Sequence, residues 1–268
     1  MKPAHKSSVV IKITNKKLHE SNKTNYSTRS RVKENIIAEA QILKFLTENN
    51  CPHIVSFIDF FDDAENLFLI MEDGGVSLFH YVTHNHQKIK TNKLQIKDWQ
   101  NVCKFLFKQM CEGIHFLHNQ VHVCHLDVSL ENTLVNSKGI KYCDFGLAER
   151  FDGNKVNGFL CNKYVGKIVY MSPEVYAKRL YFDARKNDVW CLGICFFTMI
   201  MGGHVLQKPS PKDEKFQWII SGKIKQLITG WGKLNYVDDQ IIDVFVNVFK
   251  NEAQRCNINQ LMQLAIFK

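Results

Sequence analysis

Acidic and amide side chains gather in one stretch of the sequence, residues 125–146, which reads HLDVSLENTLVNSKGIKYCDFG. Its chemistry-bearing residues are Asp127, Asn132 and Asp144. Transfer of a phosphoryl group requires positioning of the reactants, neutralisation of phosphate charge by Mg²⁺, and a carboxylate near the attacking hydroxyl. Two carboxylates and an amide within this stretch are residue types that could supply the carboxylate and the metal ligands that such chemistry needs.

The same stretch resembles the catalytic loop and the following metal-binding Asp-Phe-Gly of the eukaryotic protein kinase family. The resemblance implies that Asp127 orients the substrate hydroxyl and accepts its proton. It also implies that Asn132 and Asp144 hold the Mg²⁺ ions that bridge the phosphates of ATP. Three matches at the family's spacing favour this interpretation over the alternative, in which the acids merely cap loops.

A lysine and a glutamate nearer the N-terminus fit the resemblance. Lys12, which ends the run Val9–Lys12, is similar to the family's phosphate-binding lysine on the third strand. Glu39 would pair with Lys12 and hold it against the α- and β-phosphates. Taken alone, Lys12 would be interpreted as an ordinary exposed lysine on a strand. The position of Glu39 before Pro52–Val55 instead favours a phosphate-binding role for Lys12.

Residues 69–75, LIMEDGG, resemble the hinge between the two kinase lobes, with Met71 as the gatekeeper. The resemblance implies an ATP-binding set, which consists of Val10 above the adenine ring, Leu134 below it, the backbone of Glu72 and Gly74 at its edge, Met71 behind it and Ser77 near the ribose.

Two further segments extend the resemblance over about residues 8–265. Met171–Glu174 resembles the end of an activation segment, and Glu174 would form a buried pair with Arg255 because an unpaired buried carboxylate is costly. Asp188–Gly193, DVWCLG, matches the helix that anchors the catalytic loop through Asp188.

The sequence departs from the family pattern before Lys12. Only eleven residues precede Lys12 and none is glycine, whereas the family places a Gly-rich loop over the phosphates there. Two interpretations stay open: a truncated sequence, or a protein without a phosphate lid. Both predict an exposed sheet edge in the small lobe.

A second departure is Leu126, where the family usually has an arginine that pairs with a phosphorylated activation loop. No Ser or Thr lies between Asp144 and Ser172. We therefore expect a kinase of the non-RD type, which lacks the arginine directly before the catalytic aspartate. Its activity should not depend on phosphorylation of a Ser or Thr between Asp144 and Ser172.

The third departure is a pair of residues. The family usually has a lysine two positions after the catalytic aspartate and a threonine before the activation segment ends, whereas this chain has Ser129 and Lys167. One hypothesis is an exchange, in which Lys167 supplies the positive charge near Asp127 and the γ-phosphate. The alternative is two unrelated surface changes.

Hydrophobic periodicity predicts a strand-rich part followed by a helical part. Strands are expected at 8–14, 54–61, 66–71, 134–136 and 140–142, and helices at 33–46, 96–118, 173–179, 187–201, 213–221, 238–250 and near the end. With the resemblance, this order predicts an α+β, two-lobed protein-kinase-like fold. Its parts would be a partial, β-rich N-lobe (1–72), a hinge (73–77) and a mainly helical C-lobe (78–268).

Composition fits a folded domain, since 45% of the 268 residues are hydrophobic. Nine scattered cysteines predict free thiols in a reducing, cytoplasmic setting, and Cys143 is either an accessible thiol beside the ATP site or a buried inert one.

The net charge is +9, and residues 1–35 hold nine Lys/Arg against two acids. A solvated basic segment is favoured there over a nucleic-acid or membrane patch. The uncharged run Val189–Leu206 is interpreted as a core helix rather than a membrane span.

These features predict an ATP- and Mg²⁺-dependent serine/threonine protein kinase that acts on a protein substrate, without nucleic-acid or membrane partners. Serine/threonine specificity follows from the resemblance, because the loop lacks the Ala-Ala-Arg type of sequence of tyrosine kinases. Two alternatives stay open: a pseudokinase or scaffold with this fold, and a small-molecule kinase. The oligomeric state, the substrate and the regulators are not readable from the sequence.

Overall fold

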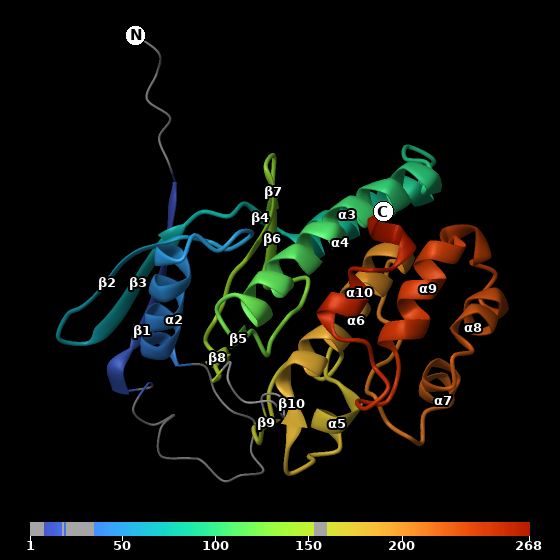
Figure 1. Ribbon diagram of the computed structural model, residues 1–268. Helices are drawn as coiled ribbons and strands as arrows, with labels where there is room; N and C mark the ends of the chain where they lie inside the picture. Colours follow the sequence, from blue (N-terminus) through green and yellow to red (C-terminus); the bar gives the residue numbers. More distant parts are fainter. Residues whose placement is uncertain (1–7, 18, 20–34, 153–159) are drawn as a thin grey trace.

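Three antiparallel strands and the long helix that packs against them form the main part of the small lobe in this computed structural model, which describes residues 8–17, 19, 35–152 and 160–268 (Figure 1). The strands are β1 (Val9–Asn15), β2 (Phe57–Asp62) and β3 (Asn66–Glu72), in the order β1-β3-β2. The Asp63 carboxylate accepts the backbone N–H groups of Glu65 and Asn66 and so closes the β2–β3 hairpin.

Helix α2 (Ile36–Glu48) packs against this sheet and positions Glu39. The Asn35 side chain caps its first turn by accepting the N–H groups of Ile37 and Ala38. Its buried residues recur at helical spacing, namely Ile36, Glu39, Ala40, Leu43 and Leu46. Glu39 therefore lies on the face turned towards the interior.

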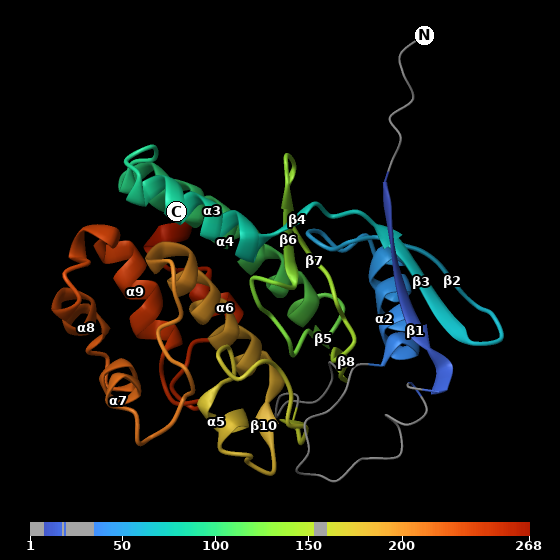
Figure 2. The same cartoon turned by 180° about the vertical axis from the view of Figure 1, so that it is seen from behind.

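Two long helices form the centre of the large lobe, α4 (Ile96–Asn119) and α6 (Ala184–Met201). They lie side by side, and the rings of Phe107 and Phe196 stack between them at a centroid distance of 4.1 Å (Figures 1 and 2). Helix α9 (Asp239–Val248) packs on α6, and α10 (Ile258–Leu261) packs on α4. Helix α8 (Ile224–Gly230) lies against α9, and α7 (Glu214–Ile220) lies against α8. The remaining helices are α3 (Leu78–Lys90) and α5 (Pro173–Tyr176).

Short strands at the lobe boundary bracket the segments that carry the candidate chemistry. They are β4 (Val76–Ser77), β5 (Val123–Cys124), β6 (Thr133–Asn136), β7 (Gly139–Tyr142), β8 (Glu149–Arg150), β9 (Leu160–Cys161) and β10 (Phe182–Asp183). Residues 125–132 connect β5 to β6, and β7 leads directly to Asp144. The β6–β7 hairpin thus brings both ends of the 125–146 stretch to one place.

The predicted α+β, two-lobed fold is confirmed, with several corrections to its elements. The strand predicted over 54–61 begins only at Phe57, since Ile54 forms a single bridge to Tyr142. Helices α3 and α8 were not predicted, and the helix predicted over 173–179 ends at Tyr176. The run from Val189 lies in the buried helix α6, as expected. The predicted division into N-lobe, hinge and C-lobe at residues 72 and 77 stays a prediction.

In the described parts of the chain, no helix is both long and apolar enough to cross a membrane.

Candidate active site

The loop that carries Asp127 is held by the buried carboxylate of Asp188. The Asp188 Oδ1 atom accepts the N–H of Leu126 and its Oδ2 atom accepts the N–H of His125, each at 2.9 Å. Leu126 has a φ of 64°, in the left-handed region that non-glycine residues rarely adopt. The two hydrogen bonds to Asp188 stabilise that strained backbone, because a strained conformation persists only where surrounding contacts hold it. The expected anchoring through Asp188 is confirmed.

Asp127 and Asn132 form a buried pair within this loop. The Asn132 side-chain amide donates to the Asp127 carboxylate oxygen Oδ2 at 2.7 Å and to the Asp127 backbone carbonyl at 3.0 Å. The other carboxylate oxygen, Oδ1, is buried and has no hydrogen-bond partner. A buried acceptor without a partner is costly in free energy. Asp127 Oδ1 is therefore an acceptor that a hydroxyl of another molecule would satisfy.

Lys12 joins the two lobes. Its ammonium group donates to Glu39 Oε2 at 2.8 Å and to Asp144 Oδ1 at 3.0 Å. Glu39 is only 1% exposed, so its carboxylate depends on such a partner. Asp144 has a φ of 62°, a second strained position at a predicted site residue. The expected Lys12–Glu39 pair is present, and its role towards phosphate stays a prediction.

The oxygen atoms available near this point suit a hard cation. Asp144 offers a carboxylate that also accepts from Lys12, and Asn132 offers its amide oxygen Oδ1, because its nitrogen is bound to Asp127. The Lys167 ammonium group donates to that Oδ1 atom at 3.1 Å, so a metal ion there would replace this hydrogen bond. Mg²⁺ prefers oxygen ligands of these two kinds and takes further ligands from water and phosphate. The residues present therefore fit the metal that the family uses.

Lys167 reaches the catalytic loop from the activation segment. Its ammonium group lies 2.8 Å from Ser129 Oγ, 3.1 Å from Asn132 Oδ1 and 3.4 Å from Asp127 Oδ2. The positive charge thus sits beside the predicted catalytic carboxylate, where the family usually places a lysine from the loop itself. The hypothesis of an exchange between positions 129 and 167 requires this geometry. The alternative, in which the two residues changed independently on the surface, does not require this geometry.

The predicted adenine-binding residues lie where the two lobes meet. Val10 on β1 is opposite Met71 in the sheet, and Met71 is buried. Gly74 lies so close to Leu134 that a Cβ atom at position 74 would approach the Leu134 Cδ1 atom to 2.7 Å. A larger residue at 74 would push the connecting backbone away from Leu134.

Glu72 and Ser77 have structural partners of their own. The Glu72 carboxylate binds the Lys141 ammonium group at 2.7 Å and the Ser56 N–H at 3.1 Å. Burial alone would raise the pKa of Glu72, but these bonds outweigh it and lower that pKa. Ser77 caps helix α3 by accepting the N–H of His80. The nucleotide contacts of both residues stay predictions.

The predicted buried pair between Glu174 and Arg255 is confirmed. The guanidinium group binds both carboxylate oxygens, at 2.6 and 3.0 Å. Burial alone would raise the pKa of Glu174, but the charge and hydrogen bonds of Arg255 outweigh this effect and lower it. The pair ties the end of the activation segment to the chain that follows α9.

Two contacts of the site were not predicted from the sequence, and the partly buried Cys143 has a perturbed thiol. His118, near the end of α4, donates from Nε2 to Asp188 at 2.9 Å, and Glu131 lies 4.0 Å from the Lys167 ammonium group. A polar residue directly beside Asn132 was the only available clue to Glu131. Burial raises the pKa of the Cys143 thiol to about 12, with a further contribution from Asp144, which favours the inert interpretation.

Comparison with known proteins agrees with this geometry. The family model described as "Protein kinase domain" matches residues 1–267. The chain is 32% identical over 219 residues to the serine/threonine-protein kinase PRR2 of Saccharomyces cerevisiae, which covers 80% of this chain and 29% of that protein. It is 30% identical over 188 residues to the serine/threonine-protein kinase CHK1 of the same yeast, covering 69% of this chain and 34% of that protein.

A plant relative shows a similar likeness. The probable serine/threonine-protein kinase CCRP1 of Zea mays is 32% identical over 178 residues, which are 65% of this chain and 25% of that protein. The chain thus spans about a third or less of the length of these relatives. The match of the family model over almost the whole chain, on a fold with this loop geometry, shows that the chain belongs to the eukaryotic protein kinase family.

Proposed function

We propose that this chain is the catalytic domain of an ATP-dependent serine/threonine protein kinase. The observation that carries the proposal is a pair of neighbouring side-chain groups. Lys12 binds Glu39 and Asp144, Asn132 binds Asp127, and a backbone hydrogen bond from Cys143, the residue before Asp144, to Asn132 joins the two groups. The relatives' names, which state serine/threonine-protein kinase, support the choice of Ser or Thr as the acceptor. The described residues offer no observation in favour of the pseudokinase alternative.

The chain's own groups would position the two reactants. Lys12, held by Glu39, would bind the α- and β-phosphates of ATP. Asn132 and Asp144 would hold Mg²⁺, which when bound neutralises phosphate charge and orients the γ-phosphate. The residues around Gly74 and Leu134 would take the adenine, with Val10 and Met71 completing that pocket.

Asp127 would act on the acceptor. A substrate hydroxyl that donates to Asp127 Oδ1 satisfies the buried oxygen that lacks a partner and is oriented for attack on the γ-phosphate. The proton of the hydroxyl then passes to Asp127. Lys167, 3.4 Å from the other carboxylate oxygen, would stabilise the negative charge that spreads over the transferred group.

The substrate and the setting of the enzyme belong to the same proposal. We infer a protein substrate and a reducing, cytoplasmic compartment. All nine cysteines are free thiols, and seven of them are buried, which suits such a compartment. No nucleic-acid or membrane partner is proposed.

Phosphate transfer from radiolabelled ATP to a library of Ser, Thr and Tyr peptides tests the function. We expect Mg²⁺-dependent labelling of Ser and Thr peptides, and Asp127→Asn should reduce kcat by about 10²–10⁴-fold. Asp98→Asn, which changes an exposed carboxylate in the first turn of α4, is the matched control and should leave kcat unchanged. Labelling that persists in Asp127→Asn, or that falls only on Tyr peptides, would contradict the proposal.

A further inference from the structure

Helix α2 must keep one orientation for the pair between Lys12 and Glu39 to exist. The helix carries Glu39, whose carboxylate lies 2.8 Å from the Lys12 ammonium group, and Lys12 in turn binds Asp144 at 3.0 Å. Strands β2 and β3 support α2 from the side of the small-lobe sheet. The contacts that hold α2 from the other side therefore bear on the whole network.

The segment that follows Asp144 contacts α2 at two points. The backbone N–H of Asn35, the residue that caps α2, donates to the Gly146 carbonyl at 3.2 Å. In the last turn of α2, the Phe45 ring stacks against the Arg150 guanidinium group, whose central carbon lies 3.9 Å from the ring centroid. Arg150 belongs to β8, which pairs with β5, the strand that precedes the catalytic loop. Arg150 thus links α2 to that loop.

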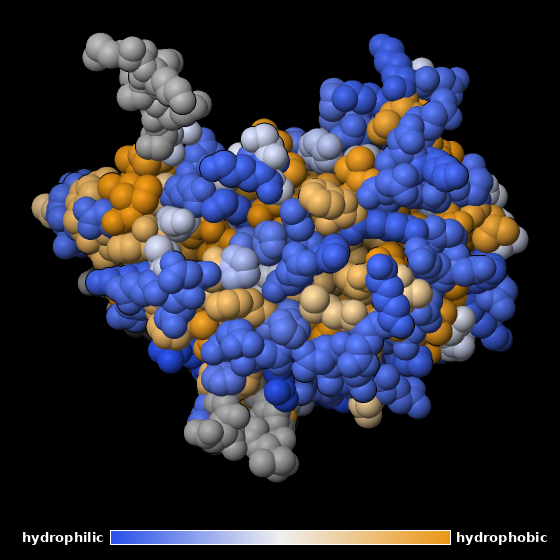
Figure 3. Space-filling model, turned by 45° about the horizontal axis from the view of Figure 1, so that its top comes forward, coloured by the Kyte–Doolittle hydropathy of each residue, from blue (hydrophilic) through white to orange (hydrophobic). Residues whose placement is uncertain are grey.

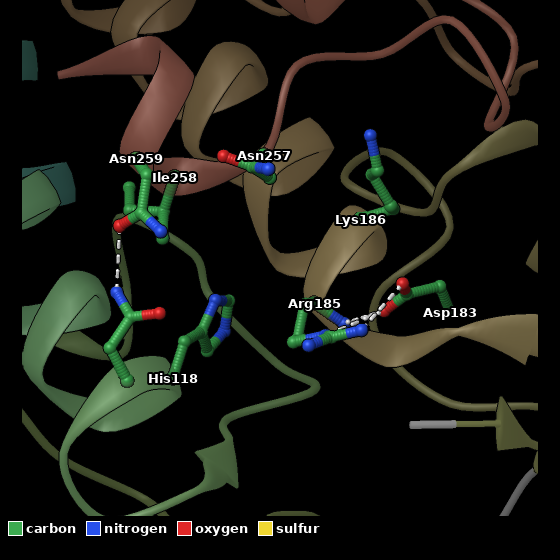
Figure 4. A pocket seen from close by; sticks show the side chains of 8 residues that line it. His118, Asp183, Arg185, Lys186, Asn257, Ile258 and Asn259 are labelled. Atoms are coloured by element: carbon green, nitrogen blue, oxygen red, sulfur yellow. Dashed lines mark hydrogen bonds and ion pairs between the residues drawn. The ribbon is translucent and has the colours of Figure 1, made fainter. Parts of the chain in front are cut away.

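The Arg150 guanidinium group has no ion pair with a carboxylate of the described residues. The other arginines that the structure describes each bind a carboxylate: Arg179 binds Glu252, Arg255 binds Glu174, and Arg185 binds Asp183 (Figure 4). A guanidinium group within about 6 Å of a ring centroid is attracted to the negative face of that ring. Stacking on Phe45 is therefore the main interaction of the Arg150 guanidinium group.

We propose that Arg150 is a positioning residue for Glu39: its stacking on Phe45 holds α2 in the orientation in which Glu39 binds Lys12. The contact needs no phosphate group, in agreement with the lack of Ser and Thr between Asp144 and Ser172. Its effect on α2 can be measured without turnover, whereas its effect on the use of ATP rests on the proposed kinase function.

Hydrogen–deuterium exchange of the nucleotide-free chain, followed by mass spectrometry, measures how readily α2 opens. Arg150→Gln removes the charge at an exposed position and creates no buried cavity. We expect exchange of the α2 amides to rise about two- to fivefold, as for the loss of one exposed cation–π contact, while the amides of α6 keep their rates. Lys44→Gln removes an exposed charge from the same helix, and should leave the exchange of α2 unchanged.

Two further variants identify the interaction. Phe45→Leu keeps an apolar side chain but has no ring to attract the guanidinium group. Once residue 45 is changed in this way, Arg150→Gln should no longer alter the exchange of α2, whatever Phe45→Leu does alone. Arg150→Lys keeps a cation, which can also lie over a ring, and its exchange should stay closer to that of the parent chain than the exchange of Arg150→Gln does.

Kinetics separate positioning from a general loss of structure. Arg150→Gln should raise the KM for ATP by up to about fivefold and leave the KM for the acceptor peptide unchanged, because Lys12 would contact only the nucleotide. Unchanged α2 exchange in Arg150→Gln, an effect that persists undiminished beside Phe45→Leu, or an equal rise of both KM values would each overturn the proposal. A chain that transfers no phosphate to any peptide would contradict the proposed function alone, since the exchange measurements still decide the role of Arg150.

Discussion

Lys167 places a positive charge beside Asp127 from a distant part of the sequence. In the family a lysine two residues after the catalytic aspartate lies beside it, and here that position is Ser129. The Lys167 ammonium group lies 2.8 Å from Ser129 Oγ and 3.4 Å from Asp127 Oδ2. This geometry is the one that the proposed exchange of roles requires, and under that proposal the charge would depend on the conformation of the activation segment.

We predict that Lys167→Ala lowers kcat by about 10²-fold, because it removes a charge that stabilises the transferred phosphoryl group. The double variant Ser129→Lys/Lys167→Thr, which restores the usual arrangement, should recover most of that loss. Lys212→Ala, at an exposed position, is the control. Steady-state kinetics at saturating ATP decide the matter: unchanged turnover in Lys167→Ala, or no recovery in the double variant, excludes an exchange of roles.

At the scale of a residue, the sequence predicted which residues form the site better than it predicted which atoms they contact. Asp127, Asn132 and Asp144 follow from a motif within one stretch, and Glu39 follows from its place in a helix. The contact of His118 with Asp188 does not, because it joins residues 70 positions apart through tertiary packing. For the same reason, only the structure could show that Asp127 Oδ1 lacks a partner.

At the scale of elements, the ion pair between Glu174 and Arg255 connects the activation segment to the chain after α9. Both side chains are almost fully buried, and Arg255 also stacks over Trp190 at 4.9 Å. Removal of one partner from a buried pair leaves an uncompensated charge, which costs much more than loss of an exposed pair. The pair should therefore govern the stability of this part of the large lobe.

We predict that Arg255→Met lowers the free energy of unfolding by about 3–5 kcal/mol at pH 7. The folded-state pKa of Glu174 is lowered, so its stabilising contribution is present above its unfolded pKa, about 4.5, and is lost as the pH falls through the folded value. In Arg255→Met this loss on acidification should disappear. Urea denaturation over a pH series from 7 down to about 2, which extends well below the unfolded pKa of Glu174, measures both effects.

The exposed pair of Arg179 with Glu252 provides the control for that measurement. Arg179 is 57% exposed, so Arg179→Met should cost no more than about 1 kcal/mol and leave the pH dependence intact. Similar costs for Arg179→Met and Arg255→Met would mean that burial does not determine the strength of the 174–255 pair.

Elements with a strong local pattern were predicted, and those without one were missed. The β6–β7 hairpin follows from short apolar runs around Ser137–Gly139, and α4 from a long helical period. Helix α3 has a polar sequence, LFHYVTHNHQKIK, and buries only one side. Its packing on the large lobe, rather than its own pattern, makes it helical, which explains the omission.

At the scale of the whole molecule, the two lobes differ in how well they cover their apolar side chains. The large lobe surrounds α6, which is buried along most of its length. The small lobe leaves β1 at the edge of its described sheet, where Val9, Ile11 and Ile13 are each about half exposed. Figure 3 shows hydrophobic surface at this end of the molecule. The expected exposed sheet edge is thus present among the described strands.

An exposed apolar edge strand can pair with another chain. We predict that this 268-residue chain self-associates through β1, and that Ile13→Lys raises the dissociation constant of the dimer at least about tenfold, since one buried isoleucine contributes about 1.5–3 kcal/mol. Leu180→Lys makes a comparable change on the large lobe, where the side chain is 74% exposed, and should leave association unchanged. Sedimentation velocity over a concentration series measures both variants. If the two substitutions have equal effects, or neither has any, the apolar edge of β1 does not drive association.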